Sequence, residues 1–285
     1  MNSSRAGILL IIVLLTLAEV FVYFKYIRPT IYCKSRILNI VAHPDDDLLF
    51  LNPDLSTAIS RGDCVTTVFM TSGDAGRGKA YWGLREEGIK AAYSYMSGVK
   101  NIWLTKSVLA GSYKFNLTRL KDYQKISLIF IRLPDGNFDG NGFSSNNYES
   151  MQKLFNGKLP NIETVDHQNR YTKIALRDLL TSIISSFNPS EIRTQDFMEK
   201  FGQGDHSDHY ATAFFVKTTI DGSNYKGVLK TYEDYKISAK SINLSKKDSA
   251  IKQNVFYLYA KYDRQAISQD YKPWLSRQYS FSFIR

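Results

Sequence analysis

The 285-residue sequence contains only two cysteines, Cys33 and Cys64, and no CxxC pair. This scarcity excludes a zinc site built from thiolates and a thioredoxin-like redox motif. One disulfide between the two cysteines is possible, but nothing in their spacing requires it, and the interpretation we favour is a pair of free buried or interfacial thiols. Internal repeats and low-complexity tracts are also absent, so a repeat array is not expected.

The charge balance is basic, with 37 Lys and Arg against 27 Asp and Glu and a net charge of +10. Hydrophobic residues make up 44% of the chain, which is enough for one large domain with a full core. A positive surface favours anionic partners such as phospholipid headgroups, although an ordinary basic surface explains it equally well. The basic residues form no long run and no nucleic-acid motif occurs, so nucleic acid is not an expected partner. Nothing in the sequence identifies a protein partner.

One long apolar run occupies residues 6–24, AGILLIIVLLTLAEVFVYF, with Glu19 as its single charge. A helix of this length can just cross a bilayer. We therefore expect a membrane anchor or uncleaved signal at 1–28, a polar tether at 29–36 and a folded domain at 37–285. A cleaved secretory signal is the alternative, but no small-x-small cleavage site follows the run.

Two opposing features of the sequence leave open on which side of the membrane the folded domain lies. Basic residues follow the apolar run more densely than they precede it, which favours a cytosolic domain. The triplets NLT at Asn116 and NLS at Asn243 are potential N-glycosylation sites, which would favour an exported domain.

Segments with strand character alternate with segments of helical periodicity after residue 35. Strands are expected at 36–42, 64–72, 102–105, 128–133 and 191–196, and helices at 54–62, 81–98, 172–188, 206–220 and 246–262. Asp205 is expected to cap the 206–220 helix, with Asp208 completing a variant capping box. The alternation predicts an α/β fold, a Rossmann-like three-layer sandwich with a mostly parallel sheet, preceded by a transmembrane helix.

Three of the four histidines lie in two clusters, HPDDD at 43–47 and HSDH at 206–209. The first cluster ends an apolar strand, at the carboxyl end where ligands of such sheets gather. His206 and His209 are three residues apart on the predicted helix and therefore share a face. His43, one aspartate and one of these histidines would form a two-His, one-carboxylate set, which is typical of catalytic zinc with an open position for water.

Each cluster by itself has an ordinary explanation. An HxxH pair on a helix is more often surface or core histidine than a metal ligand, and a PDDD segment is usually a solvated turn. Their conjunction at the predicted ends of two elements is what favours a metal site.

Three motifs in order, AHPDDD at 42–47, TSGDAGRG at 71–78 and GDHSDHYATA at 204–213, resemble the PIG-L / LmbE-like zinc-dependent de-N-acetylases. The resemblance extends from about Ile37 to Phe215. It implies that the domain at 37–285 is an LmbE-like deacetylase domain. The metal, Zn²⁺ or another divalent ion, would be bound by His43, Asp46 and His209. The resemblance also implies Asp45 as the general base and His206 as the residue that assists the tetrahedral intermediate.

Four further positions match places where the family puts supporting residues. The resemblance implies substrate contacts for Arg85, in LREEG, and Asp135, in RLPDG. It also implies that Asp205 or Asp208 orients an imidazole. A surface salt bridge, a turn or a helix cap explains each of these residues equally well.

The activity implied is a metal-dependent amide hydrolysis that removes the N-acetyl group from an N-acetylglucosaminyl substrate. With the apolar run at 6–24, the favoured substrate is N-acetylglucosaminyl-phosphatidylinositol in GPI-anchor biosynthesis, on a single-pass membrane protein of the endoplasmic reticulum. The alternative is an exported deacetylase, secreted or at the cell surface, of a soluble or cell-wall amino sugar. A non-catalytic sugar-binding module is less favoured, because the whole motif set is present. Asp47, where the glycolipid enzymes usually have Glu, and the segment 193–205 depart from that branch and leave the substrate open.

Overall fold

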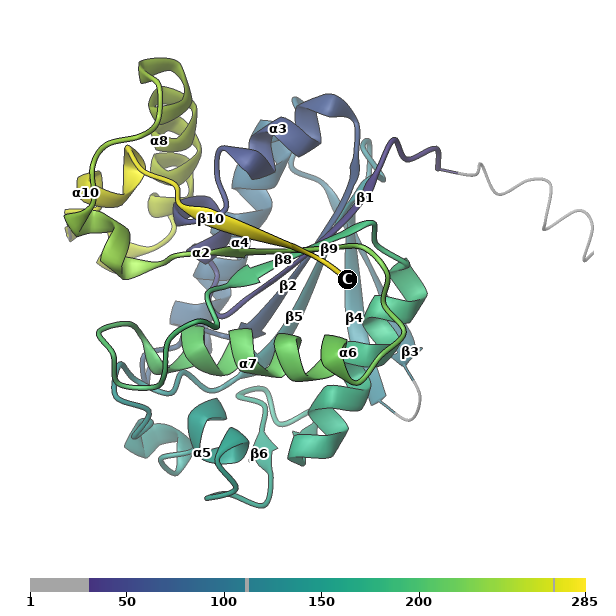
Figure 1. Ribbon diagram of the computed structural model, residues 1–285, viewed down its shortest axis with the longest axis vertical. Coiled ribbons are helices and arrows are strands. Elements are labelled where there is room, and N and C mark those ends of the chain that lie inside the picture. The colour runs from purple at the N-terminus through teal and green to yellow at the C-terminus, as the bar shows by residue number, and fades with distance from the viewer. Residues whose placement is uncertain (1–30, 111–112, 269) are drawn as a thin grey trace, which may run out of the picture. The chain divides into compact units, whose positions relative to one another are not determined.

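An eight-stranded sheet of order β10-β9-β8-β1-β2-β5-β4-β3 forms the centre of the fold (Figure 1). This computed structural model describes residues 31–110, 113–268 and 270–285. The strands are β1 Arg36–Val41, β2 Cys64–Thr71, β3 Trp103–Ala110, β4 Tyr113–Leu120, β5 Ile126–Leu133, β8 Glu191–Gln195, β9 Val228–Tyr232 and β10 Ser280–Ile284. Two short strands, β6 Ile162–Glu163 and β7 Arg170–Tyr171, form a separate sheet.

The sheet is mixed, and the predicted mostly parallel sheet is confirmed only for its centre, because both edges are antiparallel. The central strands β9, β8, β1, β2 and β5 pair in parallel. At the two edges β10 is antiparallel to β9, and β4 is antiparallel to both β5 and β3. Only residues 121–125 separate β4 from β5, and so short a link permits antiparallel pairing but no parallel crossover.

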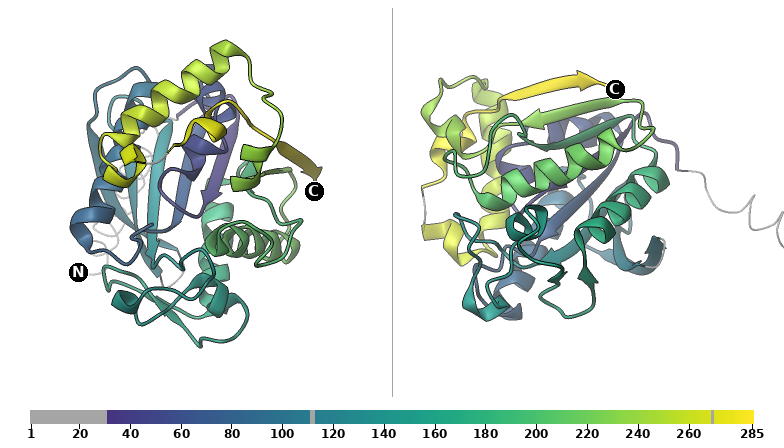
Figure 2. Two further views of the ribbon diagram at one scale, coloured as in Figure 1. Left: turned by 90° about the vertical axis from the view of Figure 1, so that its left-hand side faces the viewer. Right: turned by 60° about the horizontal axis from the view of Figure 1, so that its bottom comes forward.

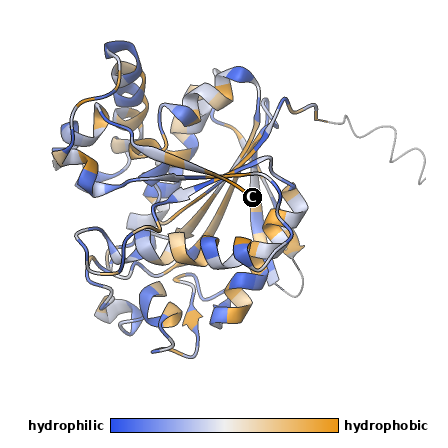
Figure 3. Ribbon diagram, viewed as in Figure 1, coloured by the Kyte–Doolittle hydropathy of each residue, from blue (hydrophilic) through white to orange (hydrophobic). Residues whose placement is uncertain are grey.

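Helices cover both faces of the sheet, as the alternation of elements predicts (Figure 2). The helices are α2 Asp46–Leu49, α3 Asp54–Arg61, α4 Lys79–Met96, α5 Met151–Phe155, α6 Lys173–Phe187, α7 Ser207–Asp221, α8 Lys246–Ala260, α9 Arg264–Ser268 and α10 Lys272–Leu275, with 3₁₀ turns η1 at Ser144–Asn146 and η2 at Tyr235–Ala239. One core cluster packs α3, α4 and α8 on one face, and a second packs α5, α6 and α7 on the other. Because both faces are covered, β1, β2 and β5 are rich in apolar residues (Figure 3), whereas β8, with the sequence EIRTQ, is largely polar.

The predicted fold class and location both depended on a membrane-spanning helix, and both are corrected. Within residues 31–110, 113–268 and 270–285, no helix has the length and apolar character needed to cross a bilayer. The apolar run at 6–24 and the whole anchor predicted at 1–28 lie outside these described ranges. The domain boundaries predicted at residues 28 and 36 stay a prediction.

The two cysteines form a disulfide, which corrects the predicted free thiols. Cys33 precedes β1 by three residues, and Cys64 is the first residue of β2. These strands are parallel neighbours in a register that places Arg36 opposite Cys64. The Cα atoms of the two cysteines are therefore only 5.2 Å apart, within the range that a disulfide can bridge. This proximity is set by strand pairing, which the spacing of the cysteines in the sequence does not reveal.

Candidate functional site

The site lies where several strands of the central sheet end. His43 to Asp47 follow the carboxyl end of β1, Asp135 follows β5, and Gln195 is the last residue of β8. The first turn of α7 adds the second histidine cluster. The predicted location at the carboxyl edge of the sheet is thus where these side chains meet.

Asp45 occupies an unusual backbone conformation between β1 and α2. Its φ of 151° lies in the region that favours glycine. The N–H of Asp45 donates to the carbonyl oxygen of His43 at 3.0 Å, and an oxygen of its carboxylate lies 2.8 Å from the Arg85 guanidinium. Such strain persists only where the surroundings hold it in place, and it is concentrated at functional sites.

Three buried side chains form a set of donors suited to a metal ion. His43, Asp46 and His209 each offer a ligand atom, and these atoms lie within 4.8 Å of one another. Asp46 Oδ2 is 3.3 Å from His43 Nδ1, and Asp46 Oδ1 is 3.2 Å from His209 Nε2. His209 Nε2 is buried and, apart from this contact with Asp46, has no polar partner among the described residues, so it is available to a ligand. Two imidazoles and one carboxylate fit a catalytic Zn²⁺ ion.

Two carboxylates hold the imidazoles of this set from behind. Asp208 Oδ2 lies 3.2 Å from His43 Nε2, and Asp205 Oδ1 lies 2.7 Å from His209 Nδ1. Each contact engages the ring nitrogen that faces away from Asp46. This is the arrangement by which outer carboxylates fix the orientation and tautomer of metal-binding histidines. The structure thus brings Asp205 and Asp208 to the places where an orienting role requires them.

His206, and not Asp205, caps α7, which corrects the capping predicted from the sequence. The helix begins at Ser207, and His206 Nδ1 accepts a hydrogen bond of 3.2 Å from the Asp208 N–H. Because Nδ1 is an acceptor, the proton of the neutral ring is on Nε2. That atom lies 3.7 Å from Asp135 Oδ1. The His206 ring is also close to that of His43, with centroids 4.6 Å apart.

Burial and neighbouring charges shift the pKa values of the side chains in this site in different directions. Burial disfavours the charged form of His43, but Asp46 and Asp208 outweigh this and raise its pKa to about 10. Burial raises the pKa of Asp45 to about 7, against the opposing effect of Arg85. Burial and the neighbouring His43 lower the pKa of His206 to about 4, so this ring is neutral at pH 7. The site therefore offers a carboxyl group that titrates near neutrality and an uncharged imidazole.

Arg85 is placed behind Asp45 and is buried. Its guanidinium contacts the carboxylates of Asp45 and Asp263, the hydroxyl of Tyr259 and the carbonyl oxygen of Gly73. All of these partners are protein groups, so the geometry favours a positioning role over the predicted substrate contact. Asp135, by contrast, lies near the imidazoles, with Oδ2 at 4.0 Å from His43 Nε2.

Several residues of the site were missed by sequence reasoning. Tyr235 packs its ring 4.9 Å from that of His209, and Asp234 Oδ2 lies 3.7 Å from His209 Nδ1. Gln195 Nε2 donates to Asp46 Oδ2 at 2.8 Å. Tyr259, in α8, and Asp263, just after it, both contact Arg85. No local pattern marks these residues, because only the chain's return to the sheet brings them to the site.

Comparison with known proteins gives one family and several related folds. Residues 38–220 match the family model described as PIG-L, GlcNAc-PI de-N-acetylase. No curated protein of similar sequence was found. The N,N'-diacetylchitobiose deacetylase from Pyrococcus horikoshii is 16% identical with a TM-score of 0.52, over 85% of this chain and 75% of that chain. The A40926 pseudoaglycone deacetylase Dbv21 is 16% identical with a TM-score of 0.51, over 84% and 86%. At these identities the likeness shows the fold.

Proposed function

The chain belongs to the PIG-L family of de-N-acetylases, and from this premise we propose that it removes the N-acetyl group from a soluble saccharide containing N-acetylglucosamine, using a divalent metal such as Zn²⁺. The observation that carries the proposal is the meeting of three features at one sheet edge. These are the donor set of His43, Asp46 and His209, the carboxylate of Asp45 on its strained backbone, and the neutral imidazole of His206.

Asp45 is suited to act as the base. A divalent ion held by His43, Asp46 and His209 would polarise the attacking water and lower its pKa. With a pKa of about 7, the Asp45 carboxylate accepts a proton from that water at neutral pH. The protonated carboxyl group then returns the proton to the amide nitrogen as the C–N bond breaks. One water and one amide thus yield acetate and a free amine.

His206 is suited to stabilise the charge that develops on the carbonyl oxygen. Its Nδ1 is occupied by the Asp208 N–H, so Nε2–H is the group available to donate a hydrogen bond. A fixed donor of this kind contributes about 3 kcal/mol to the stabilisation of a transition state. Asp135, 3.7 Å from Nε2, limits the positions that the ring can take.

Three observations favour a soluble saccharide over a glycolipid. The proteins of related fold include a deacetylase of diacetylchitobiose and one of a glycopeptide pseudoaglycone. The disulfide between Cys33 and Cys64 is typical of oxidising compartments, which suits an exported enzyme. Asn116 is exposed on β4 and accessible to glycosylation, whereas the Asn243 side chain is bonded to the Gln278 backbone.

The test is acetate release by the zinc-loaded protein from N,N'-diacetylchitobiose and, separately, from N-acetylglucosaminyl-phosphatidylinositol. We expect turnover of the soluble substrate and a loss of at least about 100-fold in kcat for Asp45→Asn, with bound zinc retained. Asp139→Asn is the matched control, because Asp139 is an exposed loop aspartate. Turnover of the lipid alone would refute the soluble substrate, and full activity of Asp45→Asn would refute the mechanism.

A further inference from the structure

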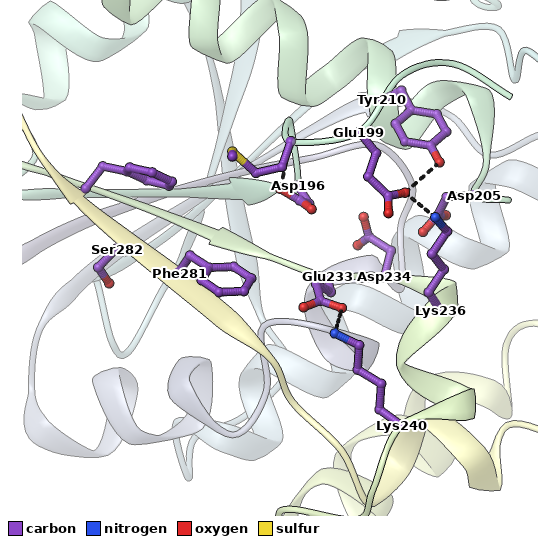
Figure 4. Close-up of a pocket in the computed structure, with 12 residues that line it drawn as sticks. Asp196, Glu199, Asp205, Tyr210, Glu233, Asp234, Lys236, Lys240, Phe281 and Ser282 are labelled. Carbon is purple, nitrogen blue, oxygen red and sulfur yellow. Dashed lines mark hydrogen bonds and ion pairs between the residues drawn. The ribbon is translucent and has the colours of Figure 1, made fainter. Parts of the chain in front are cut away.

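A cavity of about 550 Å³ lies beside the loop that connects β8 to α7 (Figure 4). Its walls come from three segments that are distant in the sequence. These are residues 196–210, residues 233–240 after β9, and residues 281–283 of β10. A volume of this size is in the range of small-molecule sites. Of its lining residues only Asp205 has a role proposed above, through its contact with His209.

The lining is acidic, with five carboxylates against two lysines. Lys236 pairs with Glu199, and Lys240 pairs with Glu233. Asp205 is also fully engaged. Its Oδ1 accepts hydrogen bonds from the His206 N–H and from His209 Nδ1, and its Oδ2 accepts one from the Tyr235 N–H. These contacts leave Asp196 without an ion-pair partner among the described residues. The one ion pair of Asp234 is the 3.7 Å contact of its Oδ2 with His209 Nδ1, a nitrogen that Asp205 already engages at 2.7 Å.

Asp234 is the second and independent sign of a ligand. Its side chain is only 3% exposed. Its Oδ1 has no hydrogen-bond partner within the described part of the chain, and its Oδ2 is 3.7 Å from His209 Nδ1. Figure 4 shows its carboxylate on the cavity side, near those of Glu199 and Asp205. A buried carboxylate oxygen left unpaired is costly, and a bound cation would satisfy it.

We propose that this cavity is a second binding site that takes an organic ammonium ion. A primary ammonium group has three N–H donors and needs only one or two carboxylates and a few carbonyl groups as partners. A Ca²⁺ or Mg²⁺ ion would need six or more oxygen ligands at about 2.0–2.6 Å, whereas Asp196 and Asp234 are the only lining carboxylates that make neither a lysine pair nor the hydrogen bonds of Asp205.

The apolar part of the lining supports the organic cation. Phe281, Phe283 and Tyr210 present aromatic rings to the cavity, and Met198 adds a flexible thioether. Aromatic faces attract ammonium ions and also cover the carbon skeleton attached to them. A hydrated metal ion gains nothing from such walls. The combination of unpaired carboxylate and aromatic rings therefore selects an amine with an apolar face.

The amine that the proposed reaction releases, a glucosamine unit, has this chemistry. This identification rests on the proposed function, whereas the ammonium site itself does not. The acetylated substrate lacks the charge, because an amide nitrogen is neutral. The cavity would therefore distinguish deacetylated units from acetylated ones.

The experiment is isothermal titration calorimetry of the full chain at pH 6.5. The zinc-loaded protein is titrated in separate runs with glucosamine and with N-acetylglucosamine. We expect glucosamine to bind at the cavity, and Asp234→Asn to weaken this binding at least about tenfold. Phe281→Ala should weaken it as well, and since Phe281 is 51% exposed its removal leaves the core intact. Asp178→Asn, the same change on the exposed face of α6, is the control and should leave binding unchanged.

Other outcomes separate this inference from the proposed function. Glucosamine binding that is equal in the wild type, Asp234→Asn and Phe281→Ala would place the amine elsewhere and overturn the inference, even if saccharides are deacetylated. Binding of Ca²⁺ that requires Asp234, with no glucosamine binding, would also overturn it. Glucosamine binding that requires Asp234 in a protein that releases no acetate would support the cavity and refute the proposed function.

Discussion

The Arg85 guanidinium lies 2.8 Å from the Asp45 carboxylate, and both side chains are about 9% exposed. This contact joins α4 to the strained turn after β1. Its close geometry depends on Gly73, where an added Cβ would lie 2.1 Å from Arg85 Nη1. Arg85 therefore fixes the position of the proposed base, which a substrate-binding role would not require.

Replacing Arg85 with Met should lower kcat on the order of 100-fold and leave KM little changed, because the base is displaced while the substrate contacts stay. Loss of the buried cation should also reduce the free energy of unfolding by roughly 3 kcal/mol. Steady-state kinetics and urea unfolding measure the two effects. Arg85→Lys should restore part of kcat.

Lys90→Met on the same helix is the control for Arg85. Lys90 is 19% exposed and pairs with Glu87, which is 52% exposed, so solvent weakens the pair and both measurements should stay near wild type. A rise in KM without a fall in kcat for Arg85→Met would instead support direct substrate binding.

Asp205→Asn should weaken zinc affinity by about 10- to 100-fold, because the amide is a poorer acceptor for the His209 Nδ1–H than the carboxylate. Competition with a chromophoric chelator measures the affinity directly and does not depend on turnover. Asp221→Asn, at the far end of α7, serves as the matched variant and should bind zinc like the wild type. Equal zinc affinities for the wild type and both variants would show that Asp205 does not support the metal site.

Two glycine substitutions should affect different properties: Gly136→Ala should lower the activity, and Gly83→Ala should raise the stability. At Gly136 an added Cβ would lie 2.5 Å from Asp208 Oδ1, so Gly136→Ala should displace the carboxylate that holds His43 and sharply reduce acetate release. At Gly83, inside α4, no atom lies within 4 Å of the added Cβ, and Gly83→Ala should stabilise the fold by roughly 0.5–1 kcal/mol. Thermal unfolding and an activity assay distinguish the two. Normal activity of Gly136→Ala would show that the Asp208 contact is dispensable.

Lys252 should make stability depend on pH in a defined direction. It is buried in α8 and donates to the Arg277 carbonyl oxygen at 2.6 Å, and burial lowers its pKa to about 7 from the usual 10.5. Below pH 7 the amine is protonated in both the folded and the unfolded states. Between pH 7 and 10.5 the folded state loses the proton first, so the unfolded state binds more protons and stability rises with pH.

Urea unfolding of the wild type and Lys252→Met at pH 6, 7.5 and 9 tests this. The wild type should gain stability relative to the variant by about 1 kcal/mol per pH unit above pH 7. Lys247→Met removes an exposed lysine of the same helix, and its free energy of unfolding should change with pH in parallel with that of the wild type. If the Lys252→Met curve also runs parallel, the buried lysine does not titrate in this range.

Much of the local structure and of the site's chemistry could be predicted from the sequence. The apolar run before His43 forms a strand that is buried on both faces. The short spacing of His206, which caps α7, and His209, in its first turn, brings their ring centroids within 5.4 Å of each other. The long helices at α4, α6, α7 and α8 lie where periodicity predicts them. These features depend on residues within a few positions of each other, which is why the sequence by itself determined them.

The features that only the tertiary structure decided depend on pairs of residues that are far apart in the chain. Strand register joins Cys33 to Cys64, and the antiparallel edges make the sheet mixed. Packing of α8 and of the segment after β9 brings Asp263 to Arg85 and Asp234 to His209. Charges buried in this way need their partners beside them, so these contacts form only when the whole sheet and both helical layers are in place.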